Sequence, residues 1–165
     1  MDYLWSPWRF RYVSEGVKSE GCVFCDLHRQ DSSRDREHLL LHRGRDNFVL
    51  LNLFPYTTGH VMIAPYAHVA NLSDLNMPTL SEMMELAQKI EAALNASYQA
   101  EGYNLGMNLG KCAGAGVADH LHLHILPRWT GDSSFISVIG ETRVLPEDLL
   151  TTYDKLGSAL QSLRQ

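Results

Sequence analysis

Residues 119–128 read Asp-His-Leu-His-Leu-His-Ile-Leu-Pro-Arg (DHLHLHILPR), a row in which histidines alternate with apolar residues. Side chains of a β-strand point alternately to its two faces, so this period of two predicts a strand. His120, His122 and His124 would lie on one face, and the leucines and isoleucine between them on the other. Burying three imidazoles side by side is costly unless they have partners. The row therefore indicates a functional site on one face of a sheet.

The composition of the 165-residue chain limits the classes of protein to which it can belong. With 45% hydrophobic and 20% charged residues, it has the make-up of a globular domain. A formal net charge of -5 argues against a broad basic surface for nucleic acid. No run of about 18 apolar residues is present, and the opening MDYLWSPWRFRY lacks the uninterrupted apolar segment of a secretory signal. We therefore expect a cytoplasmic protein that contacts neither a membrane nor nucleic acid.

Short apolar runs closed by glycine or proline predict the strands of a sheet. These runs cover residues 39–42, 47–53, 60–64, 103–109 and 120–126. Short connections between strands favour antiparallel pairing.

Two helices complete the expected architecture. Thr79 and Glu82 have the spacing of a capping box, just ahead of apolar residues at steps of three and four. The apolar face consists of Met83, Ala87, Ile90, Leu94 and Tyr98. A last helix is predicted to begin at Pro146, a favourable first-turn residue. Its apolar positions are Leu149, Tyr153, Leu156, Leu160 and Leu163.

The predicted class is α+β, with an antiparallel five-stranded sheet, a long helix packed on it and a C-terminal helix. We expect a single domain over residues 1–165. It would include an N-terminal segment, residues 1–37, that carries a cysteine pair, and a C-terminal helical tail, residues 141–165.

Two chemistries could use the histidine row. Neutral imidazoles could hold zinc or iron with one position open for water. Alternatively, one imidazole could attack phosphorus and carry a covalent intermediate. The glycine-rich loop GAGVAD before the row offers backbone N–H groups with little steric hindrance, as phosphate oxygens require. Phosphate chemistry is therefore favoured.

The row HLHLHILPR resembles the signature of the histidine triad family of nucleotide hydrolases and transferases. Residues 52–65 (NLFPYTTGHVMIAP) resemble the ribose-binding strand pair of that family. The opening LWSPWR, the cysteine pair and GMNLGKCAGAGVADHLHLHILPRWTGD together resemble a bacterial branch near the dinucleoside polyphosphate hydrolases and phosphorylases. The resemblance implies the histidine triad fold, a homodimer, a small nucleotide substrate and no organic cofactor.

The resemblance also implies catalytic roles for four histidines. His122 would attack the α-phosphate of an adenosine polyphosphate. Its other ring nitrogen would donate to the backbone carbonyl of His120, which fixes the reactive tautomer. His124 would lie near the phosphate and ribose, with His60 beside it.

Substrate-binding residues follow from the same resemblance. Asn52 would bind the ribose hydroxyls, and Asn108 would contact the phosphates and the leaving group. The phosphoryl oxygens would be held by the backbone of Gly114, Ala115, Gly116 and Val117.

The acceptor of the nucleotidyl group is a separate question. Relatives that use inorganic phosphate carry a Gly-Ser pair where this chain has Ala115 and Gly116. The missing serine favours a hydrolase over a phosphorylase or nucleotidyltransferase. Two further alternatives are a zinc-containing nucleotide-binding protein with little turnover and a metal-dependent enzyme with the histidine row as ligands.

The three cysteines are too few and odd in number for a disulfide framework, which indicates a reducing compartment. Cys22 and Cys25 have the spacing of zinc ligands but supply only half a site. His68 and His120 could complete it, and some bacterial members of the family resemble this arrangement. A structural Zn²⁺ is therefore expected, with a pair of buried thiols as the alternative. His28, His38 and His42 are expected to be solvated.

Overall fold

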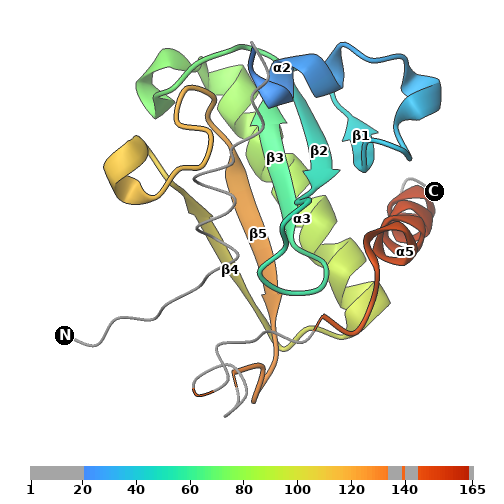
Figure 1. Cartoon of the computed structure of the whole chain (residues 1–165). Coiled ribbons are helices and arrows are strands. Elements are labelled where there is room, and N and C mark those ends of the chain that lie inside the picture. The colour runs from blue at the N-terminus through green and yellow to red at the C-terminus, as the bar shows by residue number, and fades with distance from the viewer. Residues whose placement is uncertain (1–20, 134–138, 140–144, 164–165) are drawn as a thin grey trace.

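A computed structural model describes residues 21–133, 139 and 145–163 of the chain. Its five strands are β1 (Leu40–Arg43), β2 (Asn47–Leu51), β3 (Val61–Pro65), β4 (Gly102–Met107) and β5 (Leu123–Arg128). Its α-helices are α2 (Val23–His28), α3 (Met77–Tyr98) and α5 (Leu149–Ser162). Three short 3-10 helices are η1 (Ser32–Arg34), η2 (Leu72–Asp74) and η3 (Lys111–Ala113). The strands form one sheet in the order β1-β2-β3-β5-β4, and every neighbouring pair is antiparallel (Figure 1). The predicted α+β class is confirmed.

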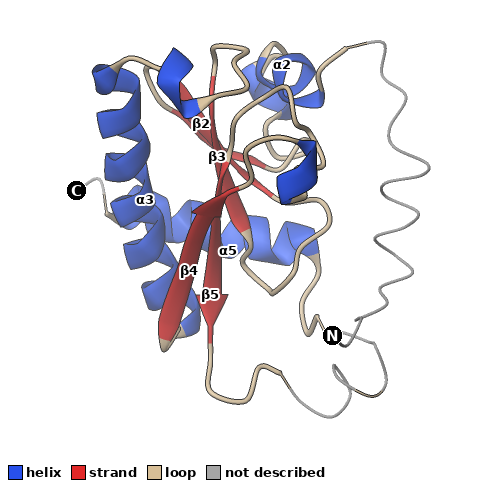
Figure 2. Ribbon diagram, turned by 90° about the vertical axis from the view of Figure 1, so that its left-hand side faces the viewer, coloured by secondary structure: helices blue, strands red, loops and turns tan. Residues whose placement is uncertain are grey.

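The two faces of the sheet carry different layers (Figure 2). On one face, apolar side chains from β2, β3 and β5 form the main core with α3 and α5. On the other face, Phe24 of α2 packs with Phe48, Leu50 and Met62. Leu123 and Ile125 belong to the main core, whereas His124 pairs with Met62 and shares its face. The predicted alternation of the histidine row is therefore observed, and the imidazole side is the face that α2 covers.

The predicted extent of the last strand is wrong at its start. β5 begins at Leu123, so His120 and His122 precede the strand. The register of β3 with β5 pairs Ile63 with Leu123, which would place Pro65 opposite Leu121. Proline has no N–H to donate, so the ladder cannot continue there. The Leu121 N–H donates instead to the Val69 carbonyl, at 2.7 Å.

The predicted start of the long helix also needs correction. α3 begins at Met77, and its N-cap is Asn76, whose side chain accepts a hydrogen bond from the Thr79 N–H. Glu82 therefore does not act in a capping box. Its carboxylate accepts from the Arg45 and Asp46 N–H groups, each at 2.7 Å, and so fixes the turn between β1 and β2.

The last helix begins three residues later than predicted. α5 starts at Leu149, so Pro146 precedes the helix, and the side chain of Asp148 caps it by accepting from two backbone N–H groups. Leu156 and Leu160 are buried in the main core, whereas Leu163 is exposed. Among the described residues, no helix is long and apolar enough to cross a membrane.

Candidate active site and metal cluster

His122 is held with one ring nitrogen satisfied and the other available. Its Nδ1 lies 2.8 Å from the backbone carbonyl oxygen of His120. A carbonyl can only accept, so Nδ1 carries the proton and Nε2 keeps a lone pair. Only 6% of the residue is exposed, and this burial lowers the pKa of His122. The imidazole is therefore neutral at physiological pH and has the tautomer that a nucleophile requires.

His60 and His124 form a second linked pair of imidazoles. The Tyr56 backbone N–H donates to Nδ1 of His60 at 3.1 Å, so that nitrogen is an acceptor. The proton of His60 then sits on Nε2, 2.9 Å from Nδ1 of His124. His124 consequently accepts at Nδ1 and carries its own proton on Nε2. Burial, and secondly the positive charge that His122 carries when it is protonated, lowers the pKa of His124 to about 4. The Nε2–H of His124 therefore belongs to a neutral donor.

The loop between β2 and β3 places His60 and Asn52 together. The Asn52 N–H donates to the His60 carbonyl at 2.9 Å, and its side-chain Nδ2 lies 3.3 Å from Nδ1 of His60. Its side-chain oxygen accepts from the Phe54 N–H at 2.9 Å. Gly59 precedes His60 with a φ of 78°, and a Cβ there would lie 2.9 Å from Leu94. Glycine at this position therefore permits the approach of the loop to the core.

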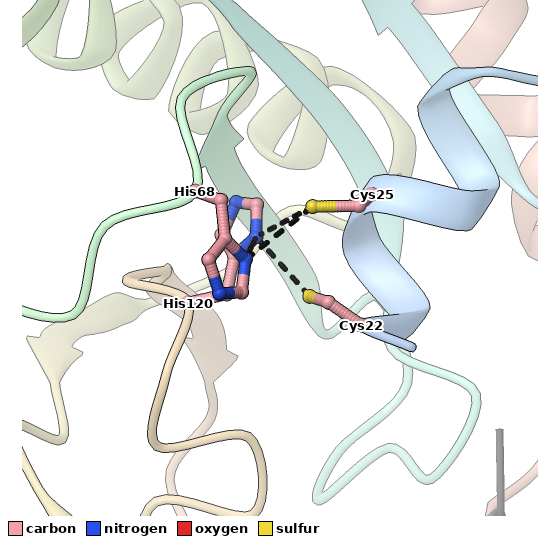
Figure 3. A group of neighbouring side chains, drawn as sticks. All are labelled: Cys22, Cys25, His68 and His120. Atoms are coloured by element: carbon pink, nitrogen blue, oxygen red, sulfur yellow. Dashed lines mark hydrogen bonds between the residues drawn. The ribbon is translucent and has the colours of Figure 1, made fainter. Parts of the chain in front are cut away.

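The cysteine pair meets two histidines from distant parts of the chain (Figure 3). Cys22 is the N-cap residue of α2 and Cys25 lies within that helix; His68 follows β3, and His120 precedes β5. Their four candidate ligand atoms all lie within 4.8 Å of one another. The predicted set Cys22, Cys25, His68 and His120 is thus brought together.

The distances within this cluster fit tetrahedral zinc. Zn–N bonds of about 2.0 Å and Zn–S bonds of about 2.3 Å place ligand atoms roughly 3.3 to 3.8 Å apart in a tetrahedron. Nδ1 of His120 lies 3.3 Å from Cys22 Sγ, 3.6 Å from Cys25 Sγ and 3.3 Å from Nδ1 of His68. One lone pair cannot serve three hydrogen-bond donors at once, whereas a cation at the centre would satisfy all four atoms.

The protonation pattern of the cluster agrees with a cation. Nε2 of His120 lies 2.8 Å from the Pro65 carbonyl oxygen and must donate to it, which leaves the Nδ1 lone pair directed at the cluster. Burial lowers the pKa of His120 to about 4. Burial also raises the pKa of the Cys25 thiol, so a bound cation is what would hold that sulfur as a thiolate. His122 and His124 contribute no ligand to this cluster, so the row does not act as one ligand set within the described residues.

The remaining predicted residues lie between β4 and β5. Asn108 directly follows the end of β4, two residues after Gly106, which pairs with His124. Gly114 has a left-handed φ of 87°, and its N–H already donates to the Lys111 carbonyl at 3.0 Å. The N–H groups of residues 115–117 make no hydrogen bond within the described part of the chain. No hydrogen bond joins Asn108 or residues 114–117 to the imidazoles in that part of the molecule.

Two aromatic residues at the site were not predicted. Phe24 contacts His122, with ring centroids 4.9 Å apart, and Tyr56 contacts His60 at 4.8 Å. Phe24 lies between Cys22 and Cys25, and Tyr56 lies in the 52–65 segment, but only the folded arrangement identifies the partners of the two rings. The prediction that His28 and His38 are solvated was wrong, because Nε2 of each is buried. The His28 ring also lies 5.5 Å from that of Phe48.

Comparison with known proteins identifies the family. A model of the HIT domain matches residues 35–131. The chain belongs to the HIT domain family. A protein named AP-4-A phosphorylase from Mycobacterium tuberculosis is 38% identical over 157 residues, which is 90% of this chain and 79% of that protein. A bis(5'-adenosyl)-triphosphatase from Saccharomyces cerevisiae is 36% identical over 91 residues, or 54% of this HIT chain and 44% of the yeast protein.

Solved HIT structures share the fold. A zinc-bound histidine triad family protein from Mycobacterium smegmatis superposes with a TM-score of 0.70 and 31% identity. The superposition covers 88% of this chain and 96% of that one. The predicted resemblance to the histidine triad family is thus confirmed, and the cysteine-histidine cluster is compatible with structural zinc.

Proposed function

We propose that this protein hydrolyses dinucleoside polyphosphates, or related adenylyl compounds, through a covalent nucleotidyl intermediate on His122. The observation that carries the proposal is the hydrogen bond from His122 Nδ1 to the His120 carbonyl, at 2.8 Å, which leaves Nε2 as an unprotonated nucleophile. Similarity to enzymes named for diadenosine polyphosphate substrates supports the substrate class.

The first step joins Nε2 of His122 to the α-phosphorus of the substrate. The bond from this phosphorus to the bridging oxygen breaks, and the rest of the polyphosphate leaves with that oxygen. The Nε2–H of His124, fixed through His60, is a donor for oxygens that gain charge in this step. We assign the ribose to Asn52, the phosphates to Asn108, and the phosphoryl oxygens to the backbone of Gly114, Ala115, Gly116 and Val117. Of these four, the Gly114 amide is committed to Lys111, so residues 115–117 are the main donors.

In the second step, an acceptor breaks the phosphorus–nitrogen bond. We favour water because Ala115 and Gly116 replace the Gly-Ser pair of phosphate-using relatives. Inorganic phosphate is the second candidate, and the 38% identity to AP-4-A phosphorylase favours it. Diadenosine tetraphosphate would yield AMP and ATP with water, or ADP and ATP with phosphate.

Zinc bound by Cys22, Cys25, His68 and His120 would tie α2 to the segments that follow β3 and precede β5. Its role would be structural, since His122 and His124 lie outside the ligand set. Reduced thiolate ligands are typical of a reducing compartment such as the cytoplasm, where we place the protein.

We also propose a homodimer formed through β4. β4 is an edge strand of the sheet, and such edges are ready to pair with another chain. Its central residues are exposed, and Leu105 among them is apolar and 45% exposed. Pairing of two β4 strands across a two-fold axis would join the two sheets.

Within each protomer, α2 and α5 pack on the sheet, so we treat the chain as one domain.

The function is tested by following the fate of the nucleotide. Diadenosine tetraphosphate is incubated with the protein in ¹⁸O-labelled water, with and without inorganic phosphate, and the products are analysed by mass spectrometry. Labelled AMP identifies water as the acceptor, and ADP identifies phosphate. His122→Ala should lose turnover and retain zinc. Turnover by His122→Ala, or loss of its zinc, would contradict the proposal.

A further inference from the structure

α2 places an aromatic side chain between the metal cluster and the active site. Phe24 lies in the sequence between Cys22 and Cys25, and 3% of it is exposed. Its ring centroid lies 5.2 Å from that of His120 and 4.9 Å from that of His122. The same ring therefore contacts one member of the metal cluster and the imidazole that we assign as the nucleophile.

His122 needs more than its hydrogen bond to have a defined direction of attack. The bond from Nδ1 to the His120 carbonyl fixes one atom of the ring and the tautomer. Rotation of the ring about that bond would still move Nε2 relative to a phosphorus atom. Phe24 contacts the imidazole at an interplanar angle of 42°, and His124 contacts it at 4.8 Å and 73°. Together these two rings restrict the rotation.

The position of α2 is itself fixed at both ends. At its start, Cys22 and Cys25 contact His120 and His68. At its end, the Arg43 guanidinium donates to the carbonyls of His28 and Gln30, at 2.7 and 3.0 Å. Arg43 is held in turn by an ion pair with Asp35, at 2.7 Å. Phe24 therefore lies on a helix that cannot shift without breaking the contacts of its cysteines or the hydrogen bonds from Arg43.

We propose that Phe24 is a positioning residue that holds the His122 imidazole in its direction of attack. The proposal rests on the function proposed above. Phe24 touches no substrate and acts only through His122. Because the cysteine-histidine cluster that fixes α2 also fixes Phe24, α2 would contribute to catalysis as well as to stability.

The test compares two phenylalanines of one core cluster. Phe24→Leu removes the flat ring face but keeps an apolar side chain. Phe48→Leu is the matched control: Phe48 is 0% exposed, packs in the same cluster and makes no ring contact with His122 among the described residues. Phe24→Met, which retains more of the volume, replaces Phe24→Leu if the latter does not fold.

We expect Phe24→Leu to lower kcat, and the single-turnover rate of adduct formation on His122, by about tenfold or more, since small misplacements of reacting groups cost up to about 100-fold. KM and zinc content should change less than twofold. Phe48→Leu should lower the melting temperature but leave kcat within about twofold of wild type. Equal kcat losses in both variants, or a loss in Phe24→Leu that parallels its loss of zinc, would overturn the proposal.

A substrate-free measurement separates this proposal from the proposed function. Nuclear Overhauser spectra at fixed neutral pH report the orientation of the His122 ring through the contacts of its carbon-bound protons with the His124 ring, assigned by comparison with His122→Ala. One defined set of contacts is expected in wild type and Phe48→Leu, and averaged contacts in Phe24→Leu. If all three proteins give the expected spectra but wild type forms no adduct on His122, the proposed function is rejected and the positioning role of Phe24 stands. Identical His122 spectra in Phe24→Leu and wild type would reject the positioning role.

Discussion

Protonation of the buried active-site histidines should destabilise the protein in mild acid, and His124 allows the size of this effect to be worked out. Burial lowers the pKa of His124 from 6.5 to about 4. The unfolded chain binds a proton at this residue as the pH falls through 6.5, whereas the folded chain binds it only near pH 4. Stability therefore rises with pH across this window and is lost as the pH falls through it. Between pH 7 and pH 5, the contribution of His124 should drop by about 2 kcal/mol.

The assay is urea unfolding of wild type and His124→Asn at a series of pH values between 7 and 5. The difference in unfolding free energy between the two proteins isolates His124 from the other histidines. Wild type should lose about 2 kcal/mol more than the variant between these limits, or roughly 4 to 8 °C in melting temperature for a chain of this size. Equal losses in the two proteins would show that His124 is not held neutral by burial.

Three further predictions follow from the core, the cluster and the sheet edge. Leu156→Ala should lower the free energy of unfolding by about 2 to 5 kcal/mol in chemical denaturation, because Leu156 is 0% exposed within the main core. A loss below about 1 kcal/mol would contradict the packing of α5 on that core. Cys25→Ser should abolish stoichiometric zinc in metal analysis and lower the melting temperature, whereas the same change at exposed Cys112 should do neither. Leu105→Lys should convert the dimer to a monomer in sedimentation, while Leu150→Lys, also an exposed leucine but on α5, should not.

Much of the fold follows from the sequence because its strands and long helix have strong apolar periodicity. Leu121, Leu123 and Ile125 all enter the main core, as the alternation of the histidine row predicts. Met83, Ala87, Ile90 and Leu94 are likewise buried on the predicted face of α3. These features depend on local spacing alone, which is why they can be predicted.

Two of the errors arise where a residue takes a partner from elsewhere in the chain instead of a local one. His120 and His122 lie outside β5 because Pro65, 55 residues from His120, has no N–H for the ladder and its carbonyl binds the His120 ring instead. Glu82 has the spacing of a capping residue but binds the turn between β1 and β2, while Asn76 caps the helix.

The candidate site shows the same division between local pattern and tertiary contact. The types and spacing of its histidines and cysteines predict which residues take part, and the family resemblance implies their roles. The protonation of each ring depends on tertiary contacts: Tyr56 fixes His60, His60 fixes His124, and the Pro65 carbonyl fixes His120. The part played by Phe24 could not be predicted, because its contact with His122 spans 98 positions of the chain.

Isolation of the covalent intermediate would show directly that His122 is the nucleophile. Wild type and His122→Ala are mixed with diadenosine tetraphosphate labelled at the α-phosphate, quenched within one turnover under conditions that preserve phosphorus–nitrogen bonds, digested and analysed by mass spectrometry. We expect an acid-labile adenylyl group on the peptide that contains residues 119–128, attached to His122 and absent from the variant. Turnover by wild type without such an adduct, or with the adduct on another residue, would contradict this role of His122.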